Sequence, residues 1–90
     1  MPNSNEFLIA ANVAKQLHTK PDLEELQLLY GYYKQATIGD INIEKPGFLN
    51  FTECKKWAAW NSVKGLSQFD AEVKYILYVN DLIQKYGVRS

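Results

Sequence analysis

The sequence predicts an all-α protein, a bundle of four helices in a single domain spanning residues 1–90. Apolar residues recur at intervals of three and four in four segments, about 5–17, 22–38, 51–63 and 67–86. Glycine and proline gather between these segments, and no stretch shows the alternation typical of a strand. Ninety residues with a 47% hydrophobic share suffice for one core without disulfides.

The segment 5–17 is amphipathic. Its apolar positions are Phe7, Ala10, Ala11, Ala14 and Leu17. Their spacing places them on one face of a helix, and Ser4 or Asn5 precedes that helix as a candidate N-cap. We expect this face to join the core.

The segment 22–38 follows a break at 19–21, and Asp22 stands where a helix start favours an acid. We expect its buried stripe to consist of Leu23, Leu26, Leu29, Tyr30 and Tyr33. Gly31 lies inside this stripe at a cost of about 1 kcal/mol relative to alanine. Either a ligand or a neighbouring backbone approaches closely there, or the glycine is merely tolerated. Gly39 ends the helix.

Residues 40–49 lack helical periodicity and contain Pro46 and Gly47, which indicates an ordered connection. A connection of this length allows the helices before and after it to point in the same direction. Asn50 with Glu53 resembles a capping box at the start of 51–63. We expect Trp57 and Trp60 to hold this shorter helix against the others.

The segment 67–86 begins with a second capping signal, Ser67 followed by Asp70. Helical spacing continues from Ala71 through Tyr75 until Gly87. The chain therefore reads as a compact bundle with one long crossover between its second and third helices.

Composition argues against several classes of function. Ten basic and ten acidic side chains balance, so nonspecific binding to nucleic acid has no electrostatic source. We see no signal peptide and no bilayer-spanning stretch, and the lone Cys54 has no internal disulfide partner, so we expect a cytoplasmic protein. His18 is the only histidine, which gives little basis for an enzyme, a metal site or a cofactor.

A cluster of phenols and amines is the strongest candidate for a binding site. Tyr30, Tyr33 and Lys34 project from one helical face at i, i+3 and i+4. Lys56, on the next helix, can close on the same anion, and the rings of Tyr33 and Tyr75 can line a purine. This combination suits an aromatic base that carries phosphate. Taken singly, a lysine is more often a solvated surface charge than a ligand contact, and a tyrosine at helical spacing is more often part of the core than a ligand contact.

Two motifs in the chain resemble the acyl-CoA-binding protein family. The run 30–40, Tyr-Gly-Tyr-Tyr-Lys-Gln-Ala-Thr-Ile-Gly-Asp, and the run 55–61, Lys-Lys-Trp-Ala-Ala-Trp-Asn, match the family pattern at the family's spacing. The resemblance extends from Phe7 to Gly87. It implies a skewed up-down-down-up four-helix bundle.

The resemblance also implies roles for individual residues in binding acyl-CoA. It assigns Tyr30, Lys34 and Lys56 to the ribose 3'-phosphate, Tyr33 and Tyr75 to the adenine, and Lys15 to the CoA phosphates. It places the acyl chain in an apolar groove between the second and third helices, with Leu26 as a contact. Thr52 replaces a lysine common in the family, so one phosphate contact is either absent or made by Lys55 instead. Gln27 replaces a residue that is usually apolar in the family, so the preferred acyl length stays open.

We therefore expect a non-enzymatic carrier of medium- to long-chain acyl-CoA esters that acts as a monomer. Its partners are then acyl-CoA-using enzymes, with transient contact with a membrane as a further option. The alternative is a helical interaction module that docks on protein or membrane through an apolar surface. That surface would comprise outward residues of the first and fourth helices, namely Leu8, Ile9, Val13, Phe69, Leu77 and Tyr78.

Overall fold

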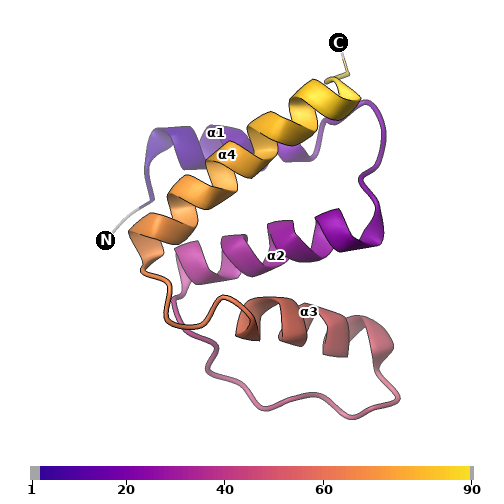
Figure 1. Cartoon of the computed structure of the whole chain (residues 1–90), viewed down its shortest axis with the longest axis vertical. Coiled ribbons are helices and arrows are strands. Elements are labelled where there is room, and N and C mark those ends of the chain that lie inside the picture. The colour runs from indigo at the N-terminus through magenta and orange to yellow at the C-terminus, as the bar shows by residue number, and fades with distance from the viewer. Residues whose placement is uncertain (1–2, 90) are drawn as a thin grey trace.

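The computed structural model describes residues 3–89, which contain four helices and no strand (Figure 1). The helices are α1 (Asn5–Ala14), α2 (Leu23–Thr37), α3 (Phe51–Asn61) and α4 (Gln68–Tyr86). The predicted all-α fold is confirmed. No helix in this part of the chain combines the length and the apolar character needed to cross a membrane.

The helices form a skewed bundle in which α4 and α2 are the two inner helices. Helix α4 packs between α1 and α2, and α2 packs between α4 and α3. Within the described part of the chain, α3 packs only against α2. After α2, the connection doubles back along the molecule, so α2 and α3 run in the same direction (Figure 1). This is the predicted long crossover. The backbones of α1 and α2 do not come into close contact with each other.

Side-chain caps begin three of the helices. Ser4 Oγ accepts a hydrogen bond from the Phe7 amide, and Ser67 Oγ accepts one from the Asp70 amide. Asp22 forms a reciprocal capping box with the residue three positions later. The prediction of a capping box at Asn50 is wrong, because its side chain makes no cap hydrogen bond.

The first helix is shorter than predicted because tertiary pairing replaces its last turn. It ends at Ala14, and Leu17 instead forms an isolated antiparallel bridge with Val88 near the C-terminus. The amide of His18 donates to the carbonyl of Gly87 at 2.8 Å. Leu17 is still buried, as expected, but reaches the core from extended backbone.

The core lies where α1, α2 and α4 meet. The prediction that Leu23 and Tyr33 of α2 are buried is wrong, because both are exposed and line cavities instead. Phe7, Ala71, Val79 and Leu82 are almost completely inaccessible to solvent. Trp60 is also buried, and its Nε1 donates to the carbonyl of Gly39 at 2.7 Å. Trp57 Nε1 likewise donates to the carbonyl of Ile43. The two indole hydrogen bonds therefore fix the connection between α2 and α3.

Gly31 allows α2 and α3 to touch through their backbones. A Cβ atom at this position would lie 2.6 Å from the carbonyl oxygen of Ala59 on α3. Of the two explanations that the sequence leaves open, the structure supports close approach, and the approaching group is a neighbouring backbone.

The outward apolar surface is smaller than the sequence suggests. Leu8, Ile9, Phe69 and Leu77 are exposed, whereas Val13 is only partly so. The assignment of Tyr78 to this surface is wrong. Its ring packs on the core and meets Tyr32 of α2 edge-on at 6.4 Å, because α2 covers that side of α4.

Candidate ligand-binding site

Two lysines from different helices converge on one aromatic ring. The ammonium of Lys34 on α2 lies 5.9 Å from the ring centre of Tyr30, and that of Lys56 on α3 lies 5.7 Å from it. Lys34 also sits 5.2 Å from the ring of Trp60. Contacts of this kind orient each cation while leaving its N–H donors available. The structure thus brings together the three residues predicted to bind a phosphate.

The electrostatics of this cluster favour an added anion. Among the residues that the structure describes, the carboxylate in contact with this cluster is that of Glu53, whose oxygen lies 3.8 Å from the Lys56 ammonium in an exposed pair. Burial, followed by the charge of Glu53, raises the pKa of the Tyr30 phenol. Tyr30 therefore keeps its proton at neutral pH and can donate a hydrogen bond to a phosphate oxygen.

Three aromatic rings from three helices form the neighbouring part of the site. Phe7 of α1 stacks on Tyr33 of α2 with ring centres 5.6 Å apart, and it lies 4.9 Å from Tyr75 of α4. Tyr33 and Tyr75 are themselves 5.8 Å apart. Tyr33 is 41% exposed whereas Tyr75 is 4% exposed, so only Tyr33 offers much free surface to a ligand. Burial raises the pKa of Tyr75 to about 12, and nearby Tyr33 adds to this effect.

Tyr33 and Tyr75 line a cavity of about 310 Å³ that lies between α1 and α2. The cavity is lined by Ala11, Ala14, Lys15, Leu26, Leu29, Tyr30, Tyr33 and Tyr75. A flat base can lie against the phenol rings while Tyr30 extends toward the lysine pair. Lys15 is present here too, so all six residues predicted to bind the nucleotide lie in one connected region.

An apolar groove adjoins this cavity and shares Leu26 and Tyr30 with it. It encloses about 340 Å³ between α2 and α3 and is lined by Leu23, Leu26, Gln27, Tyr30, Thr52, Lys55 and Lys56. Leu26 therefore lies at the junction where the sequence places an acyl contact. A second groove, of about 610 Å³, continues past Gln27 and Lys55 and reaches Phe51 and Val63.

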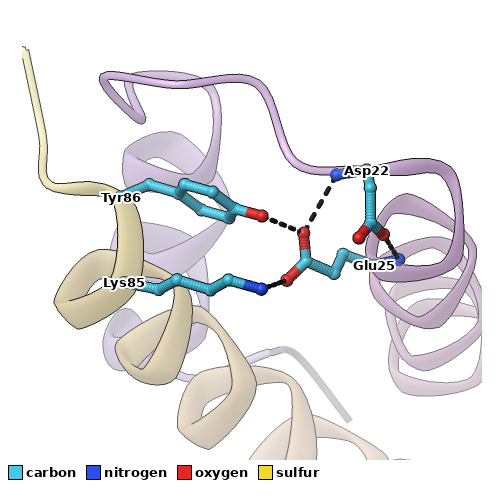
Figure 2. Close-up of polar contacts among 4 residues, drawn as sticks. All are labelled: Asp22, Glu25, Lys85 and Tyr86. Carbon is cyan, nitrogen blue, oxygen red and sulfur yellow. Dashed lines mark hydrogen bonds and ion pairs between the residues drawn. The ribbon is translucent and has the colours of Figure 1, made fainter.

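The buried carboxylate of Glu25 fixes the start of α2, the helix that carries most of the candidate site (Figure 2). Glu25 accepts hydrogen bonds from the amide of Asp22, from the Lys85 ammonium at 2.9 Å and from the Tyr86 hydroxyl. The hydrogen bonds from Tyr86 and Lys85 lower the pKa of Glu25 to about 2, and they raise the pKa of Lys85.

A second polar network fixes the end of α2. The side-chain amide of buried Gln35 donates to Asp40 and to the carbonyl of Leu66, while the Gly65 amide donates to the same Asp40 carboxylate. These hydrogen bonds lower the pKa of Asp40. The Gln-Ala-Thr-Ile-Gly-Asp part of the motif therefore contributes structure, whereas the Tyr and Lys residues before it form the site.

Sequence reasoning missed some members of the site. Phe7 was assigned to the core, yet its ring also stacks against the exposed Tyr33. Lys20 and Arg89 line a further cavity beside Lys15. No local pattern marks these two residues, because the pairing of the chain's C-terminal segment with residues 16–18 brings them together.

Comparison with known proteins identifies the family of this chain. Residues 4–79 match the family model described as Acyl CoA binding protein. The chain belongs to the acyl-CoA-binding protein family. Acyl-CoA-binding protein 2 of Saccharomyces pastorianus is 54% identical to it over 84 residues, which cover 93% of this chain and 97% of the relative. The Acyl-CoA-binding protein of Saccharomyces cerevisiae is 51% identical over the same shares.

Solved structures of the family have the same fold. The crystal structure of Oryza sativa Acyl-CoA-Binding Protein 2 superimposes with a TM-score of 0.85 at 40% identity, covering 89% of each chain. The crystal structure of ACBP from Moniliophthora perniciosa gives a TM-score of 0.82 at 38% identity, covering 89% of this chain and 79% of that one. The family resemblance of the two sequence motifs is thereby confirmed.

Proposed function

We propose that this chain binds medium- to long-chain acyl-CoA esters one to one, buffers their free concentration and hands them to acyl-CoA-using enzymes. In this proposal it is a monomeric carrier that works in the cytoplasm, needs no cofactor and catalyses no reaction. Membership of the acyl-CoA-binding protein family supports the ligand class. The relatives in Saccharomyces carry the same activity in their names.

The main support for the proposal is that three parts of the candidate site meet at Tyr30. This residue belongs at once to the lysine cluster, to the aromatic cavity and to the apolar groove. An acyl-CoA has a phosphate, a purine and an alkyl chain in one molecule. The three adjoining surfaces match these three groups in charge and polarity.

Each part of the ligand then has a defined set of contacts. Tyr30, Lys34 and Lys56 hold the 3'-phosphate by charge-assisted hydrogen bonds. Tyr33 and Tyr75 contact the adenine, and Lys15 contacts the phosphates. Leu26 contacts the acyl chain in the groove, where burial contributes about 0.8 kcal/mol per methylene.

Calorimetric titration with palmitoyl-CoA tests this function directly. We expect one-to-one binding, with much weaker binding of free CoA and of palmitate because each fills only part of the site. Heat no greater than the dilution blank would contradict the proposal. Excess free CoA released during incubation would contradict the absence of catalysis.

The second candidate is docking on a membrane or another protein through α1 and α4. It is supported by four exposed apolar side chains, Leu8, Ile9, Phe69 and Leu77. Flotation with neutral liposomes, with and without palmitoyl-CoA, distinguishes the two functions. Flotation that does not depend on ligand, combined with a failed titration, favours docking as the main function.

A further inference from the structure

The C-terminal segment is held in a defined place beside the end of α1. Residues 87–89 run antiparallel to residues 16–18, with Leu17 and Val88 paired. The amide of Arg89 donates to the carbonyl of Gln16 at 2.8 Å, and the amide of His18 donates to the carbonyl of Gly87 at the same distance. Two hydrogen bonds therefore fix the backbone of residues 87–89, and one of them is made by Arg89 itself.

This pairing brings the Arg89 side chain to a group of basic residues. Its guanidinium Nη2 donates to the carbonyl of Lys15 at 3.2 Å. Arg89, Lys15, His18 and Lys20 together line a cavity of about 380 Å³. No Asp or Glu is among the described residues that line it. The walls therefore carry three permanent positive charges and an imidazole, which favours an anion.

The basic cavity continues into the aromatic cavity of the candidate site. Both are lined by Ala14, Lys15 and Leu26. The cluster of Lys34 and Lys56 instead lies at the Tyr30 ring, against α3. The molecule thus presents two cationic groups, both bordering the aromatic cavity. A nucleotide that has phosphate on both sides of its ribose can contact both.

We propose that Arg89, with His18 and Lys20, completes a second anion subsite that holds the 5'-diphosphate of the bound acyl-CoA. This inference rests on the proposed function. It adds a ligand contact from outside the family match, which ends at residue 79. Arg89 suits the task because its planar guanidinium presents several donors to phosphate oxygens, and its backbone is already fixed.

Two ligands and two variants separate this subsite from the first. Palmitoyl-CoA and palmitoyl-3'-dephospho-CoA share the diphosphate, but only the former has the 3'-phosphate. We expect Arg89→Gln to weaken binding of both ligands by a similar factor, about 3- to 10-fold for one partly exposed charged contact. Lys34→Ala should weaken palmitoyl-CoA binding strongly and the dephospho ligand hardly at all.

Lys74→Gln is the matched control, because it removes one exposed positive charge on α4 that lines none of these cavities. It should leave both affinities unchanged, and Arg89→Lys should recover part of the loss. Wild-type affinity of Arg89→Gln for both ligands would overturn the subsite while leaving the proposed function intact. A loss confined to palmitoyl-CoA, or an equal loss in Lys74→Gln, would also overturn it. Failure of the wild-type chain to bind palmitoyl-CoA would overturn both proposals.

Discussion

Gly31 lies against the backbone of Ala59, so closely that a Cβ on the glycine would sit 2.6 Å from the Ala59 carbonyl oxygen. This contact sets how near α3 comes to α2. It therefore also sets the separation of Lys34 and Lys56, which meet at one ring from the two helices.

Gly31→Ala should destabilise the protein and weaken palmitoyl-CoA binding. Displacing the Ala59 backbone costs about 1 to 3 kcal/mol, while alanine recovers about 1 kcal/mol of helix propensity. Urea unfolding and calorimetric titration measure the two effects. Gly47→Ala is the control, since a Cβ there meets nothing within 4 Å. Equal stability and affinity in both variants would show that the helix contact does not constrain the site.

Lys34→Ala should weaken palmitoyl-CoA binding by about 1.5 to 3 kcal/mol, the range for a lost charged hydrogen bond. Calorimetry gives the affinity, and Lys74→Ala provides an exposed lysine on α4 for comparison. Thermal unfolding checks that the loss of the contacts with Tyr30 and Trp60 leaves the fold intact. Unchanged affinity would remove Lys34 from the site.

Gln27→Leu should favour long acyl chains. The amide of Gln27 lies between the apolar groove and the larger groove beyond it, so a chain that passes between them must contact a polar group. We expect affinity for palmitoyl-CoA to rise while affinity for octanoyl-CoA stays constant. Titrations with C8 to C18 esters measure the preference. No gain at any length would mean that the chain does not reach Gln27, and a uniform gain would mean that Gln27 does not set the length preference.

Glu25 should contribute stability that disappears in acid. Its pKa is lowered from 4.5 to about 2 in the folded state, so between these values the unfolded chain binds more protons than the folded one. The contribution is complete above pH 4.5 and is lost as the pH falls toward 2. Urea unfolding of the wild type and Glu25→Gln should therefore give stabilities that differ at pH 7 and converge near pH 2. A difference independent of pH would contradict the assignment.

Local spacing was sufficient to predict much of the fold and part of the site. Tyr30, Tyr33 and Lys34 share a helix, so the helical repeat alone places them on one face. The cap at Ser67 was also predictable, because capping involves residues three positions apart. Asp22 was expected only as an acid at the start of its helix, and the structure shows that it is the N-cap. The resemblance to the family was needed to connect this helix with Lys56 and Tyr75.

Features that depend on distant contacts could not be predicted in this way. Helix α1 ends early because Leu17 pairs with Val88, 71 positions away in the chain. Tyr78 is covered because Tyr32 packs against it. Asn50 has the sequence of a cap but lacks its hydrogen bond. The correct interpretation of Gly31 depends on the position of α3. No sequence pattern within α2 predicts that position.

The attachment of α3 to α2 alone has a consequence for how the protein moves. Helices α1, α2 and α4 share the core, whereas α3 packs on α2 alone with Trp60 as its one fully buried residue. Its two indole hydrogen bonds secure the preceding connection. Such an element unfolds locally at a lower free energy than the rest of the molecule. A ligand held by Lys34 on α2 and by Lys56 on α3 links the two helices and stabilises α3 against local unfolding. Amide hydrogens of residues 51–61 should then exchange fastest among the helices in the empty protein and slow the most when the cargo is loaded.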